Sequence, residues 1–152
     1  DVTVVDDDLA DAIAELEDAS REWLFEVDER VLDAVDANAY LDEHSGGRLD
    51  CKDIRTWGGS ATALTERAQP VAEGDEPPPD PEVADAAAAV LHNTRAVARS
   101  AYVHPAVFEA DDDEVAEAWR RSRRSKWYGR GERALLNLLG ARRPLLDAYL
   151  AA

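Results

Sequence analysis

Apolar side chains recur at intervals of three and four residues along most of this chain, which is the spacing of one face of an α-helix. The pattern is clearest over residues 54–64, 82–91 and 132–150. Acidic residues that can act as N-caps come before further helical stretches, at 6–8, Asp36 and 111–114. The sequence therefore predicts a mainly α fold.

Turn-forming residues separate these helices. The pair Gly46-Gly47 is expected to end the helix before it, and the proline-rich run 70–81 is predicted to be a loop. Pro144 is expected to kink or split the last helix. Outside the helical pattern, the β-branched residues 2–5 could end a strand, and the short apolar segment 23–27 is expected to be extended or a loop.

The predicted helix over residues 54–64 contains two adjacent glycines. Its apolar stripe consists of Ile54, Trp57, Ala61 and Leu64. A glycine costs about 1 kcal/mol in a helix interior. We therefore expect the pair Gly58-Gly59 at a place where another backbone comes close.

Length and composition favour one domain over residues 1–152. The chain is long enough for one sizeable core, and a hydrophobic content of 45% excludes wholesale disorder. There is no run of about 18 apolar residues and no signal-peptide pattern, so we expect a cytoplasmic protein without a membrane span. The single cysteine, Cys51, excludes an internal disulfide framework and a thiolate zinc site. Methionine is absent even at position 1, which suggests a piece of a longer chain. Residues 106–152 are expected to form a helical tail.

The net charge of −16 is distributed unevenly. Residues 1–50 carry 17 acids and 3 bases, residues 51–105 carry 8 and 5, and residues 106–152 carry 8 and 9. Nucleic acid is therefore not excluded as a partner, because the middle and last thirds are nearly neutral. The bases are 15 Arg and 2 Lys. An acid-rich, Lys-poor surface is typical of proteins that work in high salt, and a GC-rich genome is the alternative explanation.

Several common catalytic patterns are missing from the sequence. It has no glycine-rich phosphate loop, no His pair at helical spacing and no Gly-x-Ser-x-Gly turn. The acidic clusters at 6–8 and 111–113 lack the alternating spacing of a calcium loop, and we interpret them as helix caps and solvated faces. We therefore predict no metal site and no cofactor.

Two segments carry the candidate chemistry. Residues 52–60 read KDIRTWGGS, and residues 91–105 read LHNTRAVARSAYVHP. A tyrosine hydroxyl is a weak nucleophile with a pKa near 10. It attacks a phosphodiester only where cations and hydrogen-bond donors stabilise the phosphate oxygens. An arginine suits that role because its planar fork of donors spans two oxygens, and an asparagine adds a neutral donor. The candidate catalytic residues are Tyr102, Arg55 and Asn93.

The two segments resemble the catalytic C-terminal part of bacterial-type DNA topoisomerase IB, the family that includes the poxvirus enzymes. Residues 52–57 match that family's KD-[FLI]-RT-W motif, whose arginine is catalytic and is Arg55 here. Asn93, nine residues before Tyr102, resembles the family's nucleophile segment. Residues 6–25 and 35–41 also resemble the family, so the resemblance covers about residues 3–108.

The resemblance implies the catalytic core that topoisomerase IB shares with tyrosine recombinases. Tyr102 would attack a DNA phosphate, form a 3′-phosphotyrosyl link and free a 5′-hydroxyl. Arg55 and Asn93 would contact the non-bridging oxygens. Rotation of the other strand before religation would relax supercoils, without ATP or a metal because the covalent link conserves the bond energy.

The chain also differs from the family pattern. The family uses an earlier arginine and a β-hairpin lysine, the lysine as general acid, and we expect an upstream part of the same polypeptide to supply both. Lys126 lies too far along the chain to replace that lysine, so the 152 residues alone are expected to be poorly active or inactive. Arg95 stands where the family usually has proline.

The expected partner is duplex DNA at the nucleoid, bound by a monomer. The basic stretch that starts at Arg120 ends in Trp127 and Tyr128, a composition that suits contact with a DNA backbone. A solvated helix face paired with the acidic first third is an equally weighted interpretation. The candidate DNA contacts are Lys52, Arg99, Arg120, Arg121, Arg123 and Arg124.

Two alternative functions stay open. A tyrosine recombinase uses a similar Arg…His…Tyr arrangement, but the Arg-Thr-Trp motif, with Asn93 in place of histidine, favours a topoisomerase. The other alternative is a DNA-binding or interaction module that has lost catalysis, which the acidic surface and the expected missing residues would explain.

Overall fold

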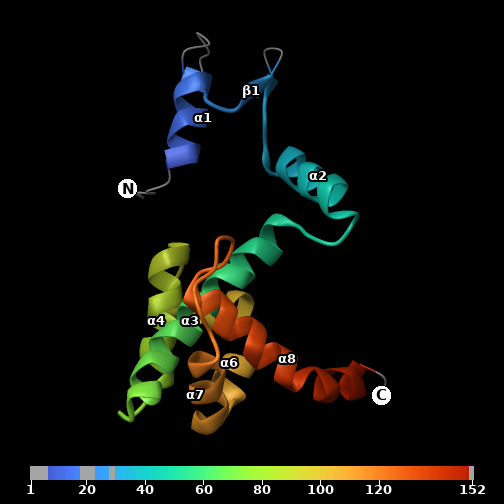
Figure 1. Cartoon of the computed structure of the whole chain (residues 1–152). Helices are drawn as coiled ribbons and strands as arrows, with labels where there is room; N and C mark the ends of the chain where they lie inside the picture. The colour runs from blue at the N-terminus through green and yellow to red at the C-terminus, as the bar shows by residue number, and fades with distance from the viewer. Residues whose placement is uncertain (1–6, 18–22, 28–29, 151–152) are drawn as a thin grey trace. The chain divides into compact units, whose positions relative to one another are not determined.

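The computed structural model describes residues 7–17, 23–27 and 30–150, with side chains for 7–16, 23–27 and 30–141. It is mainly helical, which confirms the prediction from hydrophobic spacing (Figure 1). The expected strand over residues 2–5 lies outside the described residues. The chain divides into two compact units, residues 1–51 and residues 52–152.

The first unit contains two helices and a short hairpin. Its elements are α1 (Asp7–Glu17), β1 (Glu26–Val27), β2 (Arg30–Val31) and α2 (Ala34–Ser45). The strands are antiparallel, and β1 lies in the segment expected to be extended. Among the side chains described in this unit, none is buried: Val35 is 73% exposed and Tyr40 is 62% exposed. The buried core of the described structure therefore belongs to the second unit.

The start of α2 corrects the predicted cap. The N-cap is Asp33, whose carboxylate accepts from the backbone N–H groups of Val35 and Asp36. Asp36 is the third helical residue and accepts from the backbone N–H of Asp33, so the two aspartates form a capping box. Arg30 donates two hydrogen bonds to Asp36, and this pairing lowers the pKa of Asp36 to about 2. Gly46 ends the helix in the left-handed conformation, as predicted.

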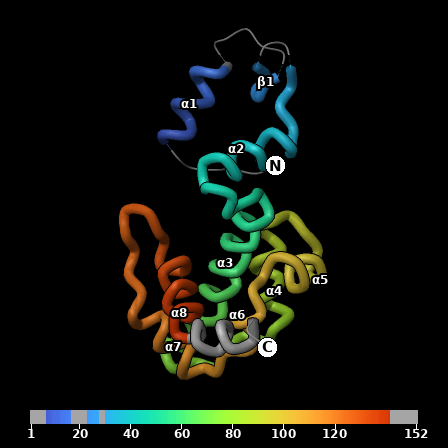
Figure 2. The backbone as a smooth tube through the Cα atoms, turned by 90° about the vertical axis from the view of Figure 1, so that its right-hand side faces the viewer, coloured from blue at the N-terminus to red at the C-terminus, as the bar shows by residue number. Residues whose placement is uncertain are grey.

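The second unit is built around α3 (Cys51–Glu73). Figure 2 shows α3 between α4 on one side and α7 and α8 on the other. The elements that follow α3 are α4 (Asp80–Leu91), α5 (Arg95–Val97), the π-helix η1 (Ala98–Tyr102), α6 (Ala106–Glu109), α7 (Asp112–Arg120) and α8 (Arg130–Leu150). The predicted acidic cap of α7 is confirmed, since Asp111 and Glu114 form a capping box.

The packed part of α3 starts later than its hydrophobic pattern predicts. Ala61 and Leu64 are buried and Trp57 packs against the core, but Ile54 is 51% exposed. No residue of α3 before Gly59 is buried. The N-terminal end of this helix is therefore available for something other than core packing.

The predicted loop over residues 70–81 is wrong at both ends. Helix α3 continues through Pro70 to Glu73, and α4 starts at Asp80, so the connection is residues 74–79. Pro70 lies in the last turn, where it removes one backbone hydrogen bond from an already long helix. Pro81 lies in the first turn of α4, where its missing N–H costs nothing because the first backbone donors of a helix have no partner. Pro144 does not split the last helix, since α8 is continuous across it.

Arg67 joins α3 to the turn between α6 and α7. The residue is only 9% exposed. Its Nη1 donates to the carbonyl oxygen of Val107 at 2.6 Å, and its Nη2 donates to the carbonyl oxygen of Ala110 at 2.7 Å and to Asp112 Oδ1 at 2.8 Å. Both carbonyl oxygens lie at the C-terminal end of α6, where the backbone donors of a continuing helix are missing, and Asp112 starts α7. Arg67 therefore links the end of one helix to the start of the next.

We predict that Arg67→Met lowers the free energy of unfolding by about 3 kcal/mol, because it leaves two carbonyl oxygens and a carboxylate without their donor. Urea denaturation followed by circular dichroism would measure the change. The control is Arg133→Met, which removes an exposed arginine and should change stability by less than about 0.5 kcal/mol. Equal effects of the two substitutions would contradict the role given to Arg67.

Candidate active site around Tyr102

The segment that carries Tyr102 begins where α4 ends. His92 closes α4 in the left-handed conformation, with φ at 53°. The backbone N–H of Asn93 donates to the carbonyl oxygen of Ala88 at 3.0 Å, and Thr94 caps α5. Tyr102 is the last residue of η1. π-Helical turns are rare and occur frequently at functional sites.

Helix α3 holds the backbone of Tyr102 at close range. A Cβ added to Gly59 would stand 2.8 Å from the carbonyl oxygen of Tyr102 and 2.8 Å from Leu91 Cδ1. The Ser60 hydroxyl donates to the same Tyr102 carbonyl at 3.4 Å and accepts from the backbone N–H of His104 at 2.8 Å. The predicted close backbone approach is confirmed for Gly59, but a Cβ on Gly58 would meet nothing within 4 Å.

Arg55 lies against the Tyr102 side chain. Its guanidinium carbon is 5.0 Å from the centroid of the Tyr102 ring, a cation–π distance. Its Nη2 donates to the carbonyl oxygen of Leu91 at 2.9 Å. The residue is exposed overall, and a guanidinium has five N–H donors, so donors remain for a ligand. The fold thus brings together two predicted site residues that are 47 positions apart.

Asn93 contributes an unused donor close by. It follows Leu91 by two residues, a span of at most about 7 Å. Its Nδ2 is buried and has no hydrogen-bond partner in the described structure, and Thr56 Oγ1, next to Arg55, is in the same state. An unpaired buried polar group costs about 1–3 kcal/mol. Each buried polar group without a partner calls for an explanation, and a ligand that supplies the missing hydrogen bond is one.

The other basic candidates differ in how far they are already engaged. Lys52 is exposed in the first turn of α3. Arg99 forms an ion pair with Asp80 at 2.8 Å, and its guanidinium lies 4.1 Å from the centroid of the Phe108 ring. Arg99 would therefore have to leave Asp80, or share it, in order to contact DNA.

The basic stretch starts at Arg120, the last residue of α7, and continues through an irregular, largely exposed segment. Arg120 pairs with Glu117 at 3.0 Å, and Arg123 donates to the carbonyl oxygen of Arg120. Arg121 and Arg124 are exposed, and the described residues provide no ion pair to either. The ring of Trp127, 77% exposed, lies 4.5 Å from Lys126 Nζ. Arg121 and Arg124 are the cations of this stretch best placed to meet a phosphate.

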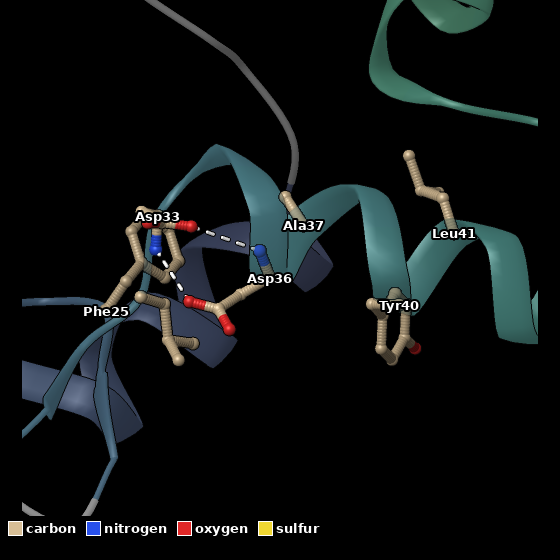
Figure 3. A pocket seen from close by; sticks show the side chains of 7 residues that line it. Phe25, Asp33, Asp36, Ala37, Tyr40 and Leu41 are labelled. Carbon is tan, nitrogen blue, oxygen red and sulfur yellow. Dashed lines mark hydrogen bonds between the residues drawn. The ribbon is translucent and has the colours of Figure 1, made fainter.

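Two pockets are relevant to the assignment of the site. One of about 380 Å³ adjoins the Tyr102 segment and is lined by Thr56, Arg99, Ser100, Ala101, Val103, His104, Pro105, Phe108 and Glu109. The other, of about 470 Å³, lies in the first unit and is lined by Phe25, Leu32, Asp33, Asp36, Ala37, Tyr40 and Leu41 (Figure 3). Its two carboxylates already accept hydrogen bonds from the start of α2 (Figure 3). This second pocket offers an apolar surface rather than reactive groups.

Comparison with models of known families and with curated proteins finds no match for this chain. Among the helices that the structure describes, none is long and apolar enough to cross a membrane. The described acidic, His and Cys side chains form no group that could hold a metal ion. The functional assignment therefore rests on the geometry around Tyr102.

Sequence reasoning missed some residues that build this site. Ser60 bridges the backbone on both sides of Val103, and Asp85 pairs with Arg95. The glycine pair indicated a close approach but not which backbone would occupy it. Nothing in the local sequence distinguishes Ser60 from any other small helical residue.

We predict opposite effects from alanine at the two adjacent glycines. Gly58→Ala should raise the free energy of unfolding by about 1 kcal/mol, because it removes a helical glycine in open space. Gly59→Ala should lower it despite the same gain, since overpacking costs about 1–3 kcal/mol and the Tyr102 carbonyl is backbone that cannot rotate away.

Urea denaturation of both variants beside the wild type would measure these changes. Gly58→Ala serves as the matched control for helix propensity. Equal stabilisation by both alanines would mean that α3 and η1 are not in close contact.

Proposed function

We propose that this chain carries the tyrosine nucleophile of a type IB DNA topoisomerase, within the catalytic core that this family shares with tyrosine recombinases. The main support is the position of Arg55, whose guanidinium lies over the Tyr102 ring while the Leu91 carbonyl fixes one of its nitrogens. Attack on a phosphodiester requires positively charged donors at the oxygens where charge develops, and a guanidinium held beside the attacking tyrosine can supply them.

The proposed reaction is a reversible transesterification. Tyr102 Oη attacks the phosphorus of a DNA phosphodiester and loses its proton to water. The bond between Tyr102 Oη and phosphorus forms as the bond from phosphorus to the 5′ oxygen breaks, and that oxygen takes up a proton to become a 5′-hydroxyl. In the reverse step the 5′-hydroxyl attacks the phosphotyrosine and restores the strand. No ATP is consumed, because each step exchanges one phosphodiester for another.

Arg55 and Asn93 have distinct parts in this reaction. The remaining guanidinium donors of Arg55 neutralise the charge on the non-bridging oxygens as it grows. The buried amide of Asn93 adds a neutral donor. Among the described residues it has no hydrogen-bond partner, which is what a site built for a ligand oxygen would show. In the free protein this donor carries a desolvation cost that binding of the phosphate would remove.

Protonation of the leaving 5′ oxygen needs a further group. The chain has two lysines, Lys52 and Lys126. We assign Lys52 to DNA contact and leave proton donation to a lysine, accompanied by a second arginine, from an upstream part of the same polypeptide. The substrate is duplex DNA of the cytoplasmic nucleoid, contacted by a monomer through the basic side chains near Tyr102 and after α7.

We expect the full-length protein to relax supercoiled plasmid in EDTA without ATP, and Tyr102→Phe to abolish both relaxation and the covalent protein–DNA adduct trapped by detergent. Agarose gel electrophoresis would follow relaxation. The control is Tyr40→Phe, which makes the same chemical change at an exposed tyrosine of the first unit and should leave the rate unchanged.

The outcomes separate the possible functions. Relaxation that survives Tyr102→Phe would place the nucleophile elsewhere. If the wild-type protein binds DNA but forms no adduct, the enzymatic proposal fails and a binding module is left. Strand exchange between two specific sites, in place of relaxation, would indicate a recombinase.

We predict that replacing Arg121 and Arg124 together by Gln weakens DNA binding and reduces its salt dependence. Each lost phosphate contact should reduce the magnitude of the slope of log K for DNA binding against log salt concentration by about 0.9. The slope of the double variant should therefore be smaller in magnitude by up to about 1.8. Fluorescence anisotropy with a labelled duplex would measure this slope. The salt concentration would be varied from about 50 to about 300 mM, a range that includes physiological ionic strength. Arg48→Gln, an exposed arginine of the first unit, is the control. An unchanged slope would mean that the stretch is a solvated face.

A further inference from the structure

Two ion pairs connect α4 to the helix that carries Tyr102. Arg95, the first residue of α5, donates from Nε to Asp85 Oδ1 at 2.7 Å and from Nη2 to Asp85 Oδ2. Arg99 of η1 donates to Asp80 at 2.8 Å. Both acids belong to α4, so this helix holds the tyrosine segment by its side chains as well as by packing.

The Asp85–Arg95 pair has the geometry that makes an exposed ion pair effective. Most surface pairs contribute little, but a two-bond contact between a guanidinium and a carboxylate is the exception. The pairing lowers the pKa of Asp85, and the side-chain hydrogen bond from Arg95 is the main cause. Both side chains are about half exposed, at 47% and 55%, so solvent screening limits the contribution of the pair to overall stability.

The place of Arg95 gives the pair a local effect. It follows the cap Thr94 and starts the single run of helix that leads through η1 to Tyr102. π-Helices are rare and occur mostly as single turns within α-helices, so a five-residue π-helix that follows a three-residue α-helix depends on contacts from neighbouring elements. At the C-terminal end of this run, the Ser60 hydroxyl donates a hydrogen bond to the Tyr102 carbonyl. Because Gly59 has no side chain, that carbonyl can lie close to α3. At the near end, the described structure provides the Thr94 cap and the contact with Asp85.

We propose that Asp85, through its two-bond contact with Arg95, is a positioning residue that sets the direction of the helical run ending in Tyr102. The inference rests on the proposed function, because it concerns the nucleophile of that reaction. Asp85 itself touches neither DNA nor the reacting atoms. A displacement of the nucleophile by about 1 Å can lower a reaction rate by about 100-fold, so loss of the pair should slow cleavage while leaving DNA binding intact.

The backbone at position 95 permits a sharp test. The Thr94 backbone has φ −75° and ψ 154°, a conformation that tolerates a following proline. Position 95 is the first of its helix, where the N–H has no intrahelical partner and proline is favoured because its fixed φ suits the helix. Arg95→Pro would therefore stiffen the start of α5 without an ion pair. If the pair acts by fixing this start, proline should replace it.

The experiment compares the wild type, Asp85→Asn and the double variant Asp85→Asn/Arg95→Pro in the full-length protein. Single-turnover formation of the Tyr102–DNA adduct should be about tenfold slower in Asp85→Asn, given the sensitivity of rates to nucleophile position, with unchanged affinity for the duplex. The double variant should recover most of the lost rate. Glu82→Gln, which removes another exposed carboxylate of α4, should react like the wild type.

Amide hydrogen exchange of residues 96–103, without DNA, tests the same point independently of catalysis. Exchange should speed up in Asp85→Asn and slow down again in the double variant. If the proline variant unfolds, exchanging the charges (Asp85→Arg with Arg95→Asp) supplies the rescue instead.

The outcomes keep the two proposals apart. A wild type that forms no Tyr102 adduct overturns the proposed function, and the exchange experiment then decides alone whether Asp85 fixes the segment. A wild type that forms the adduct, with Asp85→Asn equally fast, overturns only the positioning role. That role also fails if cleavage slows in Asp85→Asn and neither the proline nor the exchanged pair restores it.

Discussion

The close approach of backbones to α3 is the constraint on which the second unit depends. A Cβ at Gly59 would stand 2.8 Å from the Tyr102 carbonyl, which is closer than Cβ atoms come to backbone. A Cβ at Gly131 of α8 would overlap Thr65 Oγ1 and stand 3.0 Å from the Ala61 carbonyl. The close packing of α3 against both partners therefore relies on glycine at these two positions. The same close packing determines how Tyr102 is held in the candidate site. Tyr102 is fixed through its backbone, which leaves its side chain free to meet Arg55 rather than to fill the core.

Arginine side chains make the connections that apolar packing leaves open. Arg67 satisfies carbonyl groups at the break between α6 and α7, and Arg55 uses one nitrogen on the Leu91 carbonyl at the end of α4. In both cases a guanidinium, whose donors spread in a plane, bonds to backbone at a helix end and still has donors to spare. For Arg67 the spare donor takes the Asp112 carboxylate. For Arg55 it stays at the surface, and this difference in burial separates a structural arginine from a candidate catalytic one.

The sequence predicted the helices better than their contacts. The apolar spacing and the Asp111 cap located α4 and α7, because both signals are local. The start of α2 was placed wrongly at Asp36, since either of two aspartates three residues apart can cap a helix and here they act as a box. Pro70 led to a wrong prediction because proline is a strong local signal for the end of a helix. Helix α3 nevertheless continues through it, since a proline here removes only one backbone hydrogen bond. The resemblance singled out Arg55, Asn93 and Tyr102, but no local pattern encodes the π-helical turn or the contact between Asp85 and Arg95.

The acidity of the chain does not contradict a DNA-binding surface in the second unit. Residues 51–152 carry 16 acids and 14 bases, a net charge of −2, whereas residues 1–50 carry −14. Charges separated by more than a Debye length, about 8 Å at physiological salt, are largely screened at the surface. The local distribution around Tyr102 therefore matters more than the total. In that neighbourhood Arg95 and Arg99 are balanced by Asp85 and Asp80, while the remaining guanidinium donors of Arg55 lack a carboxylate among the described contacts. The positive charge that is available to pair with a phosphate therefore lies on Arg55, next to Tyr102, where the proposed chemistry needs it.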